Sequence, residues 1–304
     1  MNGLELARGY FTDCGLPMLE RDFPDLLPFL AVGLFGSGSE CFGYDDGLSR
    51  DHDFEPGFCL LLPEEELVDR RREFLLERAY AALPGEYGGV QRQRLAPVGG
   101  ARHGVMRTED FFRRALGAPN GVLSTAQWLT LPTNALAEAT NGEVFLDNFG
   151  ELTAIRARLA RFPEDIRRKR LAGQLWLMGQ AGQYNLPRCL RRGESAAARL
   201  CCAEFVKAAL AAAFLLAGRY QPYYKWSFRA LRALPTLGAL AQPLEALLSE
   251  SDTALVEAVS AAVLTEARAQ GLCSAETELE AAAYEVNTGI RDGEIRTMHL
   301  LAGI

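Results

Sequence analysis

Hydrophobic and polar positions follow different patterns in the two halves of the chain. Residues 16–31 have apolar positions at helical spacing, and the run AVGLFG that follows predicts a short strand ending in glycine. The stretch 51–62 predicts an extended strand with a kink near Pro56-Gly57, and residues 64–83 predict an amphipathic helix. The other elements expected in this half are strands at 90–95, 104–108, 127–131 and 142–147 and helices at 109–116 and 131–140.

After about Phe149 the strand signals stop. Ala-, Leu- and Arg-rich amphipathic segments continue nearly to Ile304, which is typical of a helical domain. We therefore predict an α+β fold in two domains: a mixed β-sheet of nucleotidyltransferase type with flanking helices over residues 1–152, and an all-α domain over residues 153–304. We interpret the basic stretch 156–170 as a solvated helix face near the domain joint.

Composition is that of a soluble globular protein, because 49% of the 304 residues are hydrophobic and 23% are charged. The formal net charge of -7 argues against duplex nucleic acid as a partner, since neutralising phosphates requires a clustered basic surface. The seven cysteines include no CxxC pair, no signal peptide is visible, and the longest apolar run, 208–218, is too short to cross a bilayer. These features predict a cytoplasmic protein with reduced thiols and no membrane contact.

Candidate chemistry begins at the Gly-Ser-Gly-Ser turn, residues 36–39, where the first strand ends. Because glycine has no side chain, backbone N–H groups here can approach an anion, and the serine hydroxyls can donate to phosphate oxygens. If a helix starts at this turn, its positive end adds to the attraction. Such turns also connect many elements that bind nothing, so this motif alone indicates little.

Two carboxylates follow the turn in the sequence Asp51-His52-Asp53, fourteen residues after Ser37. On a strand, alternation places Asp51 and Asp53 on one face and His52 on the other. Two like charges held this close raise one pKa unless a cation lies between them, so the pair needs either a proton or Mg²⁺. The alternative is that Asp51 caps a turn and Asp53 forms a surface ion pair.

A Gly-Ser turn between a strand and a helix, followed by DxD on the next strand, resembles the DNA polymerase β-type nucleotidyltransferase superfamily. Four strings resemble an uncharacterised bacterial branch of it, a domain family of unknown function: GLFGSGSECFGYDDGLSRDHDF, NGEVFLDNFGELTAIR, GQAGQYNLPRCLRRGE and GRYQPYYKWSFRAL. The likeness covers roughly residues 20 to 235, and the order of the four strings along one chain makes it specific.

The resemblance implies that the Gly-Ser turn holds the β- and γ-phosphates of an NTP and that the DxD aspartates bind two Mg²⁺ ions. Gly36, Ser37 and Ser39 would then bind phosphate, and Asp51 and Asp53 would be the metal ligands. Such ions bridge the attacking and leaving oxygens while a nucleoside monophosphate is transferred and pyrophosphate leaves.

A third carboxylate normally completes this site, but the strand expected after the first helix, HGVMRT, contains no acid. Glu143 and Asp147 lie on one face of the strand predicted at 142–147, so each is a candidate for the third ligand or the general base. The alternative for Asp147 is that it only begins the DNFG turn. If neither acid approaches the DxD pair, a one-metal or binding-only site is favoured.

The helical half contributes further candidates next to two proline turns, QYNLPR at 183–188 and the Tyr/Trp-rich cluster at 220–226. Tyr224 is suited to stacking on a base or on an aromatic acceptor, and Lys225 to contacting a triphosphate. The resemblance also implies a lysine of the helical domain near the nucleotide. The alternative for this cluster is core packing with hydroxyls that point outward.

These observations predict Mg²⁺-dependent transfer of a nucleotidyl group from an NTP to an acceptor. A small-molecule hydroxyl is favoured over a polynucleotide, because the chain is acidic and its basic run is short. The NTP is expected in a cleft between the domains, with Asp147 or Glu143 as the base. The alternative is a catalytically degenerate protein that binds nucleotide as a sensor or interaction module. The acceptor, the preferred NTP and the oligomeric state stay open.

Overall fold

A computed structural model gives the fold and describes residues 1–48, 54–92 and 102–304. The chain separates into two compact units: unit 1 comprises Met1–Val122 and Ala135–Ala160, and unit 2 comprises Leu123–Asn134 and Arg161–Ile304. The boundary predicted at residue 152 falls inside helix α7, which belongs to unit 1. The chain also enters unit 2 earlier, at residues 123–134, which the sequence pattern did not predict.

Unit 1 is a small β-sheet with helices around it, which confirms the predicted α+β class. Its strands are β1 (Ala31–Leu34), β2 (Cys59–Leu62), β3 (Glu86–Tyr87), β4 (Val90–Gln91), β5 (Gly104–Arg107) and β6 (Glu143–Asp147). Its helices are α1 (Gly3–Tyr10), the π-helical turn η1 (Phe11–Gly15), α2 (Leu16–Asp22), the 3-10 turns η2 (Leu27–Phe29) and η3 (Glu40–Phe42), α3 (Arg70–Ala81), α4 (Thr108–Leu116) and α7 (Glu151–Leu159). Helix α6 (Thr133–Thr140) begins in unit 2 and ends in unit 1.

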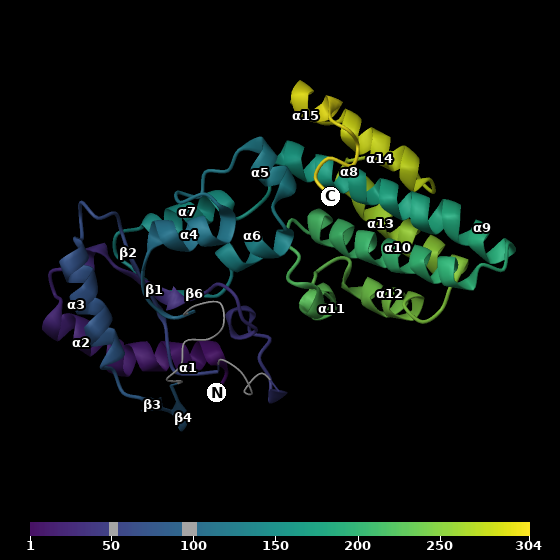
Figure 1. Ribbon diagram of the computed structural model, residues 1–304. Coiled ribbons are helices and arrows are strands. Elements are labelled where there is room, and N and C mark those ends of the chain that lie inside the picture. The colour runs from purple at the N-terminus through teal and green to yellow at the C-terminus, as the bar shows by residue number, and fades with distance from the viewer. Residues whose placement is uncertain (49–53, 93–101) are drawn as a thin grey trace. The chain divides into compact units, whose positions relative to one another are not determined.

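The four-stranded sheet has the order β5-β2-β1-β6, and β3 and β4 form a separate hairpin. β1 is antiparallel to both of its neighbours, and β2 is parallel to β5. Every residue of β1 and β2 is buried, which indicates that both faces of the sheet are covered. In Figure 1, α1 lies below these strands, and α4 and α7 lie above them.

One face of the sheet packs against the amino-terminal helices and α3. Val32, Leu60 and Leu62 project from this face into a core that also contains Tyr10 and Phe58. The rings of Tyr10 and Phe58 lie with their centroids 5.9 Å apart. Burial of these large apolar side chains is the main force that joins the helices to the sheet.

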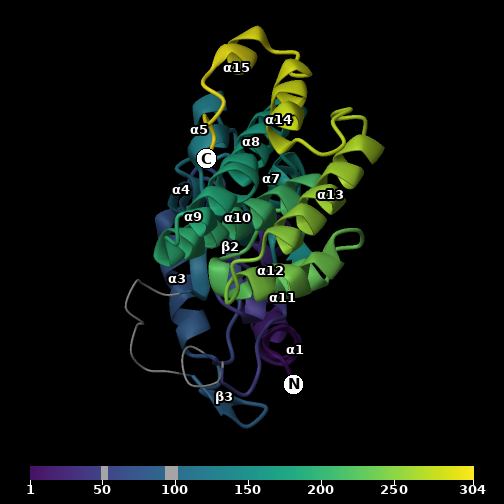
Figure 2. The ribbon, with the colours of Figure 1, turned by 90° about the vertical axis from the view of Figure 1, so that its right-hand side faces the viewer.

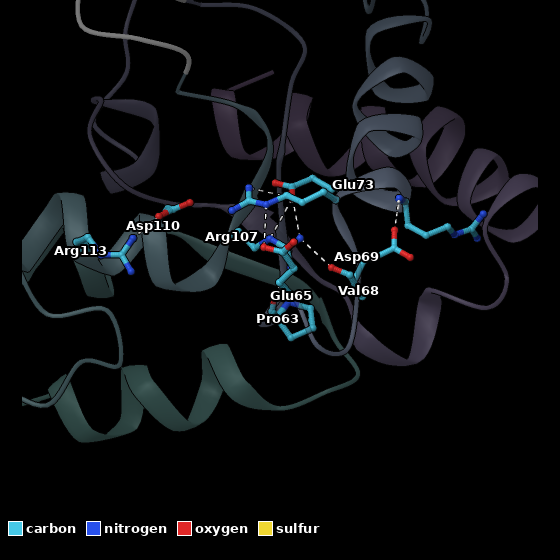
Figure 3. Close-up of polar contacts among 10 residues, drawn as sticks. Pro63, Glu65, Val68, Asp69, Glu73, Arg107, Asp110 and Arg113 are labelled. Atoms are coloured by element: carbon cyan, nitrogen blue, oxygen red, sulfur yellow. Dashed lines mark hydrogen bonds and ion pairs between the residues drawn. The ribbon is translucent and has the colours of Figure 1, made fainter.

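A buried ion pair fixes β5 against the start of α3. The Arg107 side chain, 2% exposed, donates from Nε and Nη2 to Glu73 Oε2 at 3.1 and 2.6 Å. It also donates to the carbonyl oxygens of Pro63 and Val68 at 2.6 and 2.8 Å, as Figure 3 shows. Since a buried charge is tolerated when it is paired and hydrogen-bonded, this cluster sets the path of the chain between β2 and α3.

Unit 2 consists of helices, and no strand occurs among its described residues. Besides the start of α6, these are α5 (Thr125–Thr130), α8 (Glu164–Met178), the π-helical turn η5 (Gly179–Asn185), α9 (Leu186–Arg191), α10 (Ser195–Leu216), α11 (Tyr224–Arg232), the 3-10 turn η6 (Gly238–Leu240), α12 (Ala241–Leu247), α13 (Thr253–Ala269), α14 (Leu279–Thr288) and α15 (Gly293–Thr297). The long helices α8 and α10 lie side by side, and α14 packs along α8 (Figure 1). Figure 2 shows α12 next to α10 and α13. In the part of the chain that the structure describes, no helix has both the length and the apolar character needed to span a membrane.

Two of the predicted elements differ from those observed for reasons that local helix capping explains. The helix predicted from residue 64 begins only at Arg70, because the Asp69 side chain caps it by accepting from the Arg72 N–H at 2.8 Å. The strand predicted at 127–131 is wrong, since these residues belong mostly to helix α5. A capping box formed by Ser124 and Gln127 starts that helix, and this local signal outweighs the short apolar run.

The prediction of a solvated helix face at 156–170 holds for Arg158 and Arg161, which are exposed beside the boundary between the two units, but it is wrong at the carboxyl end of the stretch. Arg170 is only 8% exposed, and Lys169 is fully buried. Lys169 Nζ donates to Asn287 Oδ1 at 3.0 Å and to the Met298 carbonyl oxygen at 2.7 Å. The long side chains reach neutral oxygen acceptors inside the fold, and a charge pattern along the sequence does not reveal such acceptors.

Candidate functional site

One edge of the sheet in unit 1 collects the polar groups around the Gly-Ser turn. Because β1 is antiparallel to β2 and β6, and β5 is parallel to β2, the carboxyl end of β1 lies beside the amino ends of the other three strands. The segments at this edge are residues 35–40, 54–58, 102–103 and 141–142. They are far apart in the sequence, and the strand order brings them together.

The Gly-Ser turn leaves consecutive backbone donors free. Gly36 and Gly38 have φ angles of 108° and 124°, in the region that favours glycine. Within residues 1–48, 54–92 and 102–304, the N–H groups of Ser37, Gly38 and Ser39 have no hydrogen-bond partner. Three successive free donors are suited to binding an anion. The helix that follows, η3, has three residues and is too short to add a helix dipole.

Asn141 holds the beginning of the turn. The Gly36 N–H donates to Asn141 Oδ1, and Asn141 Nδ2 donates to the Gly36 carbonyl oxygen, both at 2.8 Å. The N–H of Gly36, which the resemblance implies for phosphate binding, is therefore used inside the protein, and the free donors begin at Ser37. This double hydrogen bond fixes the direction in which the turn leaves β1.

Arg156 of α7 supports this arrangement. Its Nη2 donates to the carbonyl oxygens of Thr140 and Asn141 at 2.5 and 2.6 Å. Its Nη1 is buried, and no hydrogen-bond partner for it occurs among the described residues. Burial lowers the pKa of Arg156, which means that its positive charge is poorly compensated where it stands. A buried cation next to the loop that holds the turn favours a negative ligand.

Glu40 is a candidate residue that the sequence analysis missed. It is 9% exposed, and its Oε1 is buried with no hydrogen-bond partner in the described chain. Arg102 Nη1 lies 3.7 Å from that oxygen. The carboxylate folds back over Gly38, where a β-carbon would overlap it. The available signal in the sequence was an acid directly after GSGS. If the backbone N–H groups of the turn bind an anion, this carboxylate lies beside a second negative charge, and a cation between the two would be favourable.

Glu143 and Asp147, predicted to share one face of β6, lie on opposite faces, so that prediction was wrong. The register between β1 and β6 shifts at Phe145, which forms a β-bulge. Glu143 lies opposite Leu34, whereas Asp147 lies opposite Ala31. Paired residues on neighbouring strands point to the same face, and Leu34 and Ala31 are three residues apart on β1, so they face opposite sides.

The two acids also have different partners. Glu143 lies at the same end of the sheet as the Gly-Ser turn and forms an ion pair with Arg8. Asp147 lies at the other end of β6, and its two oxygens accept from the Gly150 and Thr153 N–H groups at 2.9 and 2.7 Å. These bonds cap the start of α7, which fits the alternative that Asp147 begins the DNFG turn.

The predicted metal ligands Asp51 and Asp53 lie outside the described residues, as does His52. Beyond them the chain leads into β2, and Glu55 Oε1 lies 3.8 Å from His103 Nδ1 at the sheet edge. Among the residues that the structure describes, no group of three or more His, Cys, Asp or Glu side chains is arranged to hold a metal ion. The metal site is therefore a prediction from the sequence.

Tyr224 and Lys225, the candidates from the helical half, begin α11 in unit 2, and both are exposed. The Tyr224 side chain is 74% exposed, and its ring centroid lies 4.4 Å from that of Tyr223. Lys225 Nζ lies 5.1 Å from the centroid of the Trp226 ring. Core packing does not describe these side chains, which are accessible aromatic and cationic groups.

Comparison with known families gives a partial match. The family model described as "Domain of unknown function (DUF4037)" matches residues 128–227, about a third of the chain. The matched segment includes β6, the QYNLPR turn and the cluster at 220–226, and it does not include the Gly-Ser turn at 36–39. No curated protein and no solved structure matches the chain. Over residues 128–227 the chain is thus similar to a family whose function is not known.

Proposed function

We propose that this chain is a Mg²⁺-dependent nucleotidyltransferase that moves a nucleoside monophosphate from an NTP to a small-molecule hydroxyl and releases pyrophosphate. The Gly-Ser turn carries the proposal. Its free N–H groups at Ser37, Gly38 and Ser39 lie at the sheet edge where the chain enters β2, a few residues after the DxD sequence. In the superfamily that the sequence resembles, these two motifs bind the phosphates and the metal.

The surroundings of the turn support phosphate binding. Asn141 fixes the turn before any ligand arrives, so little ordering is required on binding. Arg102 and Arg156 bring positive charge to the same edge, from the segment before β5 and from α7. Donors and charges held in place by the fold stabilise negative charge that develops on phosphate oxygens during transfer.

One described residue suits a divalent cation. Glu40 Oε1 is a buried carboxylate oxygen without a hydrogen-bond donor in the described chain, and carboxylate oxygens are ligands that Mg²⁺ prefers. Together with Asp51 and Asp53, which the sequence provides upstream of β2, it makes a set of three acids. The bound ion would neutralise phosphate charge and orient the attacking hydroxyl.

In the proposed transfer, the acceptor oxygen forms a bond to the α-phosphorus, and the bond from that phosphorus to the oxygen bridging to the β-phosphate breaks. The hydroxyl proton passes to a carboxylate base, and pyrophosphate leaves. Glu143 suits the role of base better than Asp147, because it lies at the end of the sheet that carries the turn. Tyr224 and Lys225 are proposed to contact the nucleotide or the acceptor through their exposed groups.

The test is calorimetric titration of the full chain with each NTP in Mg²⁺, combined with detection of pyrophosphate in the presence of a metabolite extract. The variant Asp53→Asn should weaken Mg²⁺-dependent NTP binding about tenfold or more, while its unfolding free energy changes by less than about 0.5 kcal/mol. Glu66→Gln, which alters an exposed acid of the same unit, is the matched control and should bind as the wild type does. Unchanged NTP affinity in Asp53→Asn would refute the site assignment.

A second candidate function is binding of nucleotide without turnover, as in a sensor. Its support is that both acids predicted as the third carboxylate are engaged, Glu143 with Arg8 and Asp147 with the start of α7. The same titration separates the two functions. NTP binding without pyrophosphate under every acceptor condition favours the sensor, whereas pyrophosphate release that Asp53→Asn abolishes favours the transferase.

A further inference from the structure

Unit 2 contains a cavity of about 240 Å³ that is lined by two arginines and by no acidic side chain. Arg170 and Gln174 reach it from α8, and Arg219 and Gln221 from the segment after α10. One wall is apolar and includes Phe214 of α10. All of the lining residues belong to unit 2.

Arg170 is buried, and no carboxylate pairs with it among the described residues. Only 8% of the residue is exposed, and Nη1 donates to the carbonyl oxygens of Trp128, Leu129 and Leu131 at 3.0, 3.0 and 3.2 Å. These carbonyls end helix α5, where orphan acceptors need donors. Within the described chain, Nε and Nη2 of Arg170 have no hydrogen-bond partner.

The charge of Arg170 is correspondingly uncompensated. Burial lowers its pKa to about 10, and the Tyr220 hydroxyl opposes this effect in part. The ring of Phe162 lies 5.2 Å from the guanidinium carbon, which offers a weak cation–π contact but no negative charge. A nearby anion would stabilise the charged form of Arg170.

Arg219 adds a second cation with a free head group. The chain reverses at Gly218, whose φ is 62°, and the Arg219 N–H donates to the Phe214 carbonyl oxygen at 3.0 Å. This helix end fixes the backbone of Arg219 beside the cavity. Its guanidinium makes no ion pair or hydrogen bond with any residue of the described chain.

We infer that this cavity binds the anionic group of a small organic molecule, a phosphate or a carboxylate held between Arg170 and Arg219. Planar guanidinium groups bind both anions with paired hydrogen bonds. Gln174 and Gln221 line the same space, although the Gln221 Nε2 already donates to Ser227 Oγ at 3.1 Å. The cavity is smaller than the range of about 300 to 1,000 Å³ typical of drug-sized ligands. It therefore fits an anion on a short apolar body, which Phe214 and its neighbours would contact, rather than a whole nucleotide.

The test measures binding to the full chain at low salt and without NTP, so its result does not depend on the transferase proposal. The probes are n-butyl phosphate, butyrate, inorganic phosphate and, as a neutral control, n-butanol. We expect one of the organic anions to bind more tightly than inorganic phosphate, and n-butanol not to bind. Tighter binding of butyl phosphate identifies a phosphate site, and tighter binding of butyrate identifies a carboxylate site.

Two variants test the assignment without removing buried contacts. Arg219→Ala should weaken anion binding about tenfold, because it removes one of the two charges. Gln174→Glu should abolish binding, since the new carboxylate pairs with the arginines from inside the cavity. Arg199→Ala, an exposed arginine near the other end of α10, is the control and should bind within about twofold of the wild type. The inference fails if no probe binds, or if Arg219→Ala and Gln174→Glu bind as the wild type does.

Discussion

Arg107 in unit 1 and Arg170 in unit 2 are both buried, with 2% and 8% of each residue exposed, but they are neutralised differently. Arg107 donates twice to the Glu73 carboxylate and also to two carbonyl oxygens. Among the described residues, Arg170 donates only to carbonyl oxygens, and it lines a cavity that has no acidic side chain in its wall. The same side chain thus closes a structural cluster in one unit and leaves a charge available to a ligand in the other.

The comparison teaches how a structural charge differs from a binding charge. An arginine that is paired with a carboxylate and hydrogen-bonded through several nitrogens gains little from a further anion. An arginine that is hydrogen-bonded through one nitrogen, and only to neutral oxygens, still attracts an anion. Arg156 beside the Gly-Ser turn resembles Arg170 in this respect, since its Nη2 is bonded to carbonyls and its Nη1 has no partner in the described chain.

The largest expected effect is in unit 1. Glu73→Ala leaves Arg107 buried without its counter-ion and should cost about 3 to 5 kcal/mol of unfolding free energy. Arg113→Ala breaks only exposed ion pairs with Glu109 and Asp110 and should cost less than about 1 kcal/mol. Urea unfolding measures the change in free energy, and hydrogen exchange of the β2 and β5 amides shows whether the loss is local to the buried pair. Equal costs in the two variants would mean that the buried pair contributes no more than a surface one.

The next effect is in unit 2. Arg170→Met removes a charge that has no acid partner but leaves carbonyls at the end of α5 without donors, so it should cost about 1 to 3 kcal/mol. All three tryptophans, Trp128, Trp176 and Trp226, lie in unit 2, so their fluorescence reports its unfolding. If Arg170→Met loses as much unfolding free energy as Glu73→Ala, Arg170 would be as strongly neutralised by the fold as Arg107 is, and the contrast between them would not hold. The variant should also lose any stabilisation by n-butyl phosphate or butyrate.

The smallest expected effect concerns Glu285, a carboxylate that accepts hydrogen bonds from neutral donors of Ser274. Hydrogen bonds from the Ser274 N–H and hydroxyl lower the pKa of Glu285. Because the folded-state pKa is below the unfolded value of about 4.3, the stabilisation is present above that pH and disappears as the pH falls through the folded-state pKa. Glu285→Gln should therefore lower the free energy of unfolding at pH 7 by less than about 1 kcal/mol, and the variant should melt at a lower temperature than the wild type. Near pH 2 the two proteins should melt at the same temperature. Tryptophan fluorescence melts between pH 2 and pH 7 measure this, and a difference that persists at pH 2 would contradict the assignment.

Much of the sheet could be predicted from the sequence, because short apolar runs bounded by turns are local signals. AVGLFG, HGVMRT and GEVFLD each contain the strand that the structure shows, β1, β5 and β6. The run at 127–131 has the same appearance but forms helix α5, because the residue that decides its structure, Ser124, lies before the run. The prediction that Glu143 and Asp147 share one face of β6 was wrong because the bulge at Phe145 shifts the register, and strict alternation of side chains requires an uninterrupted ladder.

The candidate site could be predicted only in part. Gly-Ser turns are common, and this one was singled out because the DxD sequence follows it fourteen residues after Ser37. Asn141 lies 105 residues from Gly36, and nothing in its own surroundings marks it as the partner of the turn. Glu40 is adjacent to the turn, but its burial and its unbonded oxygen depend on how the surrounding segments pack.

The sequence by itself determined the kinds of elements in each half of the chain, because periodicity and capping act within a few residues of each other. The tertiary structure decided which side chains meet: Asn141 with Gly36, Glu73 with Arg107, and Arg170 with carbonyls alone. Those contacts depend on strand order and helix packing between segments that are distant in the chain. Burial then determines whether a charge is neutralised or left open to a ligand, and burial is a property of the folded chain as a whole.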